Sequence, residues 1–170
     1  MMSNLVTFYK GLGTDTAGRT IDEIWGWDHR RLEMVHDFIQ WLFPLPEPSR
    51  FNPDAPLLTP DDIAAFRADP ALRDRGRRSL DVMLEFYGLS RAGTEITRGA
   101  NFAARANVWL EPANHNHLRL TRILLFLRHA GLGAEAAGLL ACLEHIAEHE
   151  GAGIVTGRTL SFWRSDARNA

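Results

Sequence analysis

Four polar side chains recur at helical spacing near the N-terminal third of the chain, and their types could bind a ligand. His29, Glu33, His36 and Gln40 fall on one narrow ridge of a helix predicted over 29–43. A histidine on this ridge could exchange a proton or a hydrogen bond with a ligand, and a glutamine could orient that ligand. A boundary stripe that bonds a neighbouring helix explains the same spacing, since histidines beside a core face often have a structural role.

Two arginines mark a second ridge, on a helix predicted over about 115–131. His115, Arg119, Arg122 and His129 line up there, with Phe126 among them, at spacings of three or four residues. Because apolar residues occupy two other sides of this helix, we expect it to be central in the fold. Arginines on a central helix need acceptors, either carboxylates of this chain, helix C-terminal carbonyls or an anionic ligand.

The segment "HIAEH", His145 to His149, matches a pattern of inverted zinc peptidases. In that pattern two histidines one turn apart bind the metal and the glutamate, here Glu148, is the general base. An uncharacterised metal-dependent hydrolase that uses this pair, or His36, is therefore one alternative function. All three side chains fall opposite the apolar stripe of a helix predicted over 134–150, so a solvated helix face explains them as well. We expect no catalytic residue, no metal site and no cofactor.

The charge balance excludes a global field that would recruit nucleic acid, because 19 basic and 21 acidic residues leave a net charge of -2. The run "RDRGRR", Arg73 to Arg78, makes a nucleic-acid-binding protein the second alternative, but Asp74 interrupts it and no aromatic residue is interleaved, so a solvated helix face is favoured. Cys142 is the single cysteine; it excludes an internal disulfide, and we expect it in the core.

Local signals divide the chain into segments with helical period. Caps, N1 prolines and terminal glycines or prolines predict where helices begin and end. These signals are Thr20 with Glu23, Asp28, Pro44, Thr59-Pro60, Asp69-Pro70, Gly88, Glu111-Pro112, Asn114 and Gly151.

The segments between these signals predict an all-α fold. Five prolines within residues 44–56 predict an ordered, extended connector, and residues 89–99 predict a polar loop. A short helix is expected over 101–110, and the tail "IVTGRTLSFWRS" fits a short helix or a strand. We expect one domain over residues 1–170, an irregular orthogonal array of about six helices with a proline-rich connector.

The N-terminus lacks the features of a signal peptide, and no apolar run reaches the length of a membrane span. We therefore expect a cytoplasmic protein with no integral membrane segment and no nucleic-acid partner.

Three stretches, in order, resemble the opioid growth factor receptor conserved-region family. "HDFIQWLFPLPEPS" is similar to the family's helix that closes with Ile-Gln-Trp-Leu-Phe-Pro, and "MLEFYGL" and "HNHLRLTRIL" match two further stretches. "FYKG" near the start is similar to the family's opening. The resemblance covers about residues 8–135 and indicates a free-standing, single-domain member.

The resemblance implies receptor activity towards a small opioid peptide and a role in growth regulation. We expect a small-ligand or peptide binding and regulatory module rather than an enzyme, with a small anionic ligand or peptide as partner. The expected ligand-binding residues are His36, Gln40, His115, Asn116, Arg119 and Arg122.

Overall fold

The computed structural model of the chain describes residues 1–165, which are mostly helical. This part of the chain contains ten helices and one two-stranded antiparallel sheet, with helices taking 57%, so the expected all-α array of about six helices fits only roughly. The chain divides into two compact units, Met1–Val82 and Met83–Ala170, and the boundary falls inside α6 (Pro70–Tyr87). That residues 1–170 form one domain stays a prediction.

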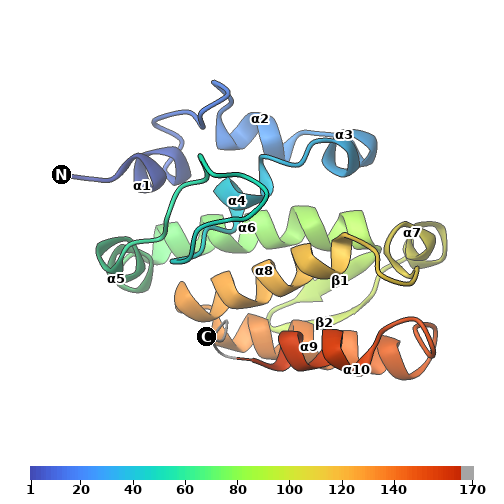
Figure 1. Cartoon of the computed structure of the whole chain (residues 1–170). Coiled ribbons are helices and arrows are strands. Elements are labelled where there is room, and N and C mark those ends of the chain that lie inside the picture. The colour runs from blue at the N-terminus through green and yellow to red at the C-terminus, as the bar shows by residue number, and fades with distance from the viewer. Residues whose placement is uncertain (166–170) are drawn as a thin grey trace. The chain divides into compact units, whose positions relative to one another are not determined.

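The first unit is built from short helices whose starts follow the local capping signals. Thr20 and Glu23 form the predicted capping box, Asp28 accepts from the Arg31 amide, and Thr59 caps with Asp62. The helices are α1 (Asn4–Tyr9), α2 (Ile21–Trp25), α3 (His29–Met34), α4 (Ile39–Leu42), α5 (Pro60–Ala68) and the first part of α6 (Figure 1). Sequence analysis did not identify α1, because a helix of six residues carries little periodic pattern.

Aromatic side chains dominate the core of the first unit. The buried Tyr9 hydroxyl lies 2.6 Å from the Leu42 carbonyl and 2.9 Å from the Ser79 hydroxyl, joining α1, α4 and α6. The proline-rich connector follows α4 and is held by a bridge between Leu45 and Leu57, which confirms the predicted stop at Pro44.

The second unit contains a hairpin where the sequence predicted a polar loop over 89–99, so that prediction is wrong. β1 (Leu89–Ala92) pairs with β2 (Glu95–Arg98), and Ala92 lies opposite Glu95 across a two-residue turn. Gly88 has φ +82°, which glycine adopts without steric cost, and it turns the chain out of α6 into β1. Ile96 is only 5% exposed, so this single apolar side chain anchors the strand.

Four helices complete the second unit: α7 (Phe102–Trp109), α8 (Asn116–His129), α9 (Gly133–Glu148) and α10 (Gly157–Arg164). The tail is therefore helical. Helix α8 lies beside α9 and α10, and α9 also packs against β2 (Figure 1). Arg128 of α8 donates to the carbonyls of Trp163 and Ser165, which fixes the end of α10. Of the helices described, none is long and apolar enough to cross a membrane.

Candidate functional site

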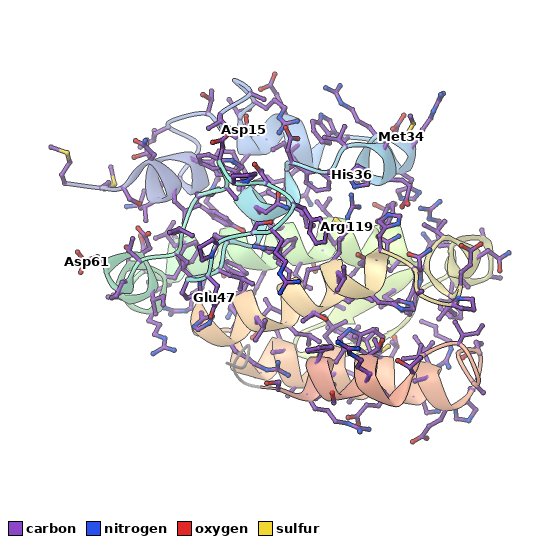
Figure 2. All side chains as sticks on the ribbon, viewed as in Figure 1. Asp15, Met34, His36, Glu47, Asp61 and Arg119 are labelled. Atoms are coloured by element: carbon purple, nitrogen blue, oxygen red, sulfur yellow. The ribbon has the colours of Figure 1, made fainter. Side chains whose placement is uncertain are left out.

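His36 and Gln40 do not share a helical ridge, because the predicted helix over 29–43 is broken. Helix α3 ends at Met34, Val35 is extended (φ −90°, ψ 131°) and α4 begins only at Ile39. His36 is exposed and lies in the segment between the two helices. Figure 2 labels it near α3. The predicted ridge of His29, Glu33, His36 and Gln40 is therefore wrong.

Tertiary contacts explain the break. Phe38 is fully buried and packs edge-on against Trp27 at 5.4 Å between ring centroids, and the neighbouring Asp37 pairs with Arg19 at 2.9 Å. Burying one large aromatic side chain removes most of its apolar surface from water, which outweighs the loss of one or two helical hydrogen bonds.

Gln40 is the buried member of the two, with 5% of its surface exposed. Its side-chain oxygen lies 3.4 Å from the Asn52 amide nitrogen, which donates from the proline-rich connector. Gln40 thus ties α4 to the connector within the first unit, a structural bond that the sequence spacing did not indicate.

Arg119 and Arg122 lie on α8, which is buried along nearly its whole length, as predicted. Their exposed fractions are only 5% and 7%, and Figure 2 marks Arg119 on this helix. Residues three apart are neighbours on a helix surface, so one side of α8 carries two buried, positively charged residues. A guanidinium stays charged when buried and requires acceptors for its donors.

The start of α8 holds His115, Asn116 and His117 in different environments. His115 is exposed, whereas Asn116 is fully buried, and its side-chain oxygen lies 3.4 Å from the Tyr87 hydroxyl. The His117 Nε2 lies 2.8 Å from the Trp109 carbonyl, which can only accept, so this nitrogen carries the proton. Burial lowers the pKa of His117, which keeps the ring neutral.

Aromatic residues around the start of α8 were missed by the sequence analysis. The indole nitrogen of Trp163 donates to the His117 carbonyl at 3.2 Å, and that of Trp109 donates to the Tyr87 carbonyl at 3.0 Å. Their only sequence signal is that Trp and Tyr seek a polar partner when buried. These contacts show that Asn116 and His117 join α6, α7, α8 and α10 within the second unit.

The "HIAEH" segment is a poor metal site. His145, Glu148 and His149 are exposed, as predicted, and the two rings stack at 4.2 Å. Arg98 Nη1 lies 3.0 Å from His145 Nδ1, and arginine can only donate, so the other nitrogen of His145 carries its proton and is not a ligand. Within residues 1–165 no group of three or more His, Cys, Asp or Glu side chains could hold a metal ion.

The "RDRGRR" run bonds within its own unit. Arg73 donates to the carbonyls of Phe66 and Arg67 at the end of α5, and Arg75 stacks on Trp25 at 4.8 Å. Cys142 is 7% exposed, which confirms its predicted place in the core, and burial raises its pKa to about 11.

Of the six expected ligand-binding residues, the structure thus places Asn116, Arg119 and Arg122 on α8 of the second unit and His115 at its N-cap position. It places His36 and Gln40 in the first unit, where a helix break separates them. Helical spacing therefore correctly predicted one helix that carries Arg119 and Arg122, and wrongly predicted one helix that carries His36 and Gln40.

Comparison with known proteins identifies the relatives of this chain. The family model of the opioid growth factor receptor (OGFr) conserved region matches residues 1–167. The opioid growth factor receptor of Rattus norvegicus is 40% identical over 138 residues, which are 77% of this chain and 23% of that protein. Opioid growth factor receptor-like protein 1 of Mus musculus is 33% identical over 153 residues, 85% of this chain and 32% of that protein.

The matched segment is thus less than a third of the length of either relative. No solved structure matches the chain. Because the family match covers nearly every residue, the chain belongs to the opioid growth factor receptor conserved-region family.

Proposed function

We propose that this chain is a peptide-binding or small-ligand-binding regulatory module whose ligand carries a carboxylate or phosphate. The observation that carries the proposal is the pair of buried arginines on α8, Arg119 and Arg122. Planar guanidinium groups bind carboxylates and phosphates through paired hydrogen bonds, and burial strengthens such contacts. The relatives are named opioid growth factor receptors, so receptor activity towards that growth factor is part of the proposal.

Two of the remaining expected residues have supporting roles in this proposal. Asn116 is a buried amide of the same unit that can fix the orientation of the ligand, and His115 is an exposed imidazole beside the start of α8. His36 and Gln40 lie in the first unit and are not assigned to this ligand. A cytoplasmic location, from the sequence features described above, belongs to the same proposal.

The proposal is tested by measuring how the protein binds fluorescently labelled opioid growth factor. Replacing Arg119 or Arg122 with Met keeps most of the apolar length of the side chain and removes the charge. We expect each change to weaken binding about 10- to 100-fold, since a charged hydrogen bond contributes about 1.5–3 kcal/mol. A C-terminally amidated peptide should bind the unchanged protein more weakly by a similar factor. Its affinity for the Met variants should be no lower than that of the unmodified peptide for the same variants.

Thermal unfolding of the same variants separates binding from folding. Arg158→Met is the matched control, because Arg158 is an exposed arginine of the same unit that lies over Phe162. Intact folding with lost binding supports the proposal. The opposite result has two parts: the Met variants unfold, and the Arg119→Lys and Arg122→Lys proteins fold and bind the amidated peptide with full affinity. That result would show that the arginines only stabilise the fold.

A further inference from the structure

The guanidinium of Arg98 joins the end of β2 to the end of α9. Its Nε donates to one carboxylate oxygen of Glu150 at 2.8 Å, and its Nη2 pairs with the other oxygen. This two-point contact lowers the pKa of the Glu150 carboxyl and raises the pKa of Arg98, so both groups keep their charges at mildly acidic pH. Helix α9 packs against β2 (Figure 1), and Arg98 adds a charged contact to that packing.

His145 is the third member of this contact, and its part in it depends on its protonation state. Arg98 Nη1 lies 3.0 Å from His145 Nδ1. A guanidinium has no acceptor, so Nδ1 must present its lone pair and the imidazole must be neutral. A second proton on this ring would occupy Nδ1, and two donors and two positive charges would then face each other. The contact between Arg98 and His145 is therefore compatible with only one of the two states of the imidazole.

His149 places a second imidazole against the first. The two rings stack with their centroids 4.2 Å apart and their planes 27° apart. The His149 Nδ1 lies 2.7 Å from the His145 carbonyl, which can only accept, so this nitrogen carries a proton and Nε2 is the atom that takes up a second one. Both histidines are exposed, and two charged rings at this distance repel each other, so double protonation favours separation of the rings.

The elements that pack against α9 carry further charged groups near this turn. Together with those of α9 itself and Glu150, they are Arg98 of β2, Arg128 of α8, Arg164 of α10, Cys142, Glu144 and Glu148. Arg164 pairs with Glu144 at 2.7 Å, and Arg128 donates to carbonyls at the end of α10. Burial raises the pKa of Cys142, so its thiol stays neutral. Arg98 is thus the cation in direct contact with the histidine pair.

We propose that Arg98, His145, His149 and Glu150 form a pH-sensitive switch that holds the last turn of α9 to β2 at neutral pH and loosens it under mildly acidic conditions. Histidine ordinarily takes up its second proton near about pH 6.5. Uptake by His145 ends its contact with Arg98, and uptake by both rings also ends their stacking. The pair between Arg98 and Glu150 persists, so the change is confined to this turn. The switch does not involve Arg119 or Arg122 and does not depend on the proposed function.

NMR spectra of 15N-labelled protein between about pH 8 and pH 5 test the switch directly. The Arg98 Nε–H signal, assigned by its disappearance in Arg98→Lys, and the amides of residues 96–98 and 146–150 report on the contact. We expect these signals to shift together, with one midpoint, as the pH falls. Amide hydrogen exchange at residues 146–149 should become about two- to fivefold less protected after correction for its intrinsic pH dependence, since an exposed charged contact is weak.

His145→Gln is the decisive variant, because the glutamine oxygen can accept from Arg98 but cannot be protonated in this range. His145 is exposed, so the variant should fold normally, and its Arg98 signal should lose the pH dependence. His36→Gln is the matched control: it removes an exposed histidine of the first unit and should keep the full response. A response in His145→Gln as large as in the unchanged protein, or no response in the unchanged protein, would overturn the proposal.

Discussion

Replacing Gly138 with alanine tests how α9 packs against the hairpin. A Cβ atom added at Gly138 would lie 1.9 Å from the Thr94 carbonyl oxygen and 3.1 Å from the Thr94 carbonyl carbon. Both are backbone atoms of the hairpin turn, so no side-chain rotation relieves the clash. The turn or the helix must move by about 1 Å or more, since Cβ contacts below 3.0 Å essentially never occur.

The expected magnitude combines two opposing terms. Overpacking of this kind costs about 1–3 kcal/mol, and a backbone clash belongs at the upper end of that range. Alanine inside a helix is favoured over glycine by about 1 kcal/mol, which offsets part of the cost. We therefore expect Gly138→Ala to lower the free energy of unfolding of the second unit by about 2 kcal/mol.

Gly133→Ala provides the matched control, because it lies in the same helix and a Cβ there would meet nothing within 4 Å. Equilibrium urea unfolding, followed by the amide NMR signals of the hairpin, reports on the unit that contains the change. We expect Gly133→Ala to be within about 0.5 kcal/mol of the unchanged protein or slightly more stable. If Gly138→Ala were as stable as Gly133→Ala, the close contact between α9 and the turn would be refuted.

Three further predictions concern buried groups. Burial lowers the pKa of His117, so the unfolded chain binds a proton at this histidine more readily than the folded chain. The contribution of His117 to the free energy of unfolding should be complete above about pH 6.5, the pKa of an unfolded histidine, and should fall below it. Urea titrations at pH 5 and 7.5 should show a smaller pH dependence for His117→Gln than for the unchanged protein. The Cys142 thiol, with its pKa raised by burial to about 11, should react with Ellman's reagent at pH 8 only after unfolding; rapid reaction in the folded state would contradict its burial. Tyr9→Phe removes the hydroxyl 2.6 Å from the Leu42 carbonyl and should cost about 1–2 kcal/mol by thermal unfolding, whereas an unchanged stability would show that this bond is dispensable.

Most helix starts could be predicted because the interactions that fix them are local. The side chains of Thr20, Asp28 and Thr59 each accept from an amide three residues later, and such bonds form with the first turn of the helix. The central place of α8 followed from its apolar residues on more than one side. The arginines that could bind an anion were also visible, since charged residues in a buried helix stand out by type.

The prediction that His36 and Gln40 lie on one helix was wrong because of a tertiary contact. The apolar pattern over 29–43 continues through the break, so periodicity predicts one helix. The chain instead leaves the helix at Val35, and Phe38 is buried against Trp27, eleven residues away. No local signal reports that contact, and the ridge of polar residues disappears with the helix.

The sequence alone determined the family, the positions of most helix ends and the central place of the helix that carries Arg119 and Arg122. Only the tertiary structure decided that residues 89–98 pair as a hairpin and that the turn of this hairpin lies so close to Gly138 of α9 that a Cβ atom there would clash. It also decided that the buried indole nitrogen of Trp41 has no acceptor within residues 1–165. Helix caps and hydrophobic periodicity reflect interactions within one or two helical turns, so the sequence reveals them. Strand pairing, close backbone approach and unsatisfied donors depend on segments that only folding brings together.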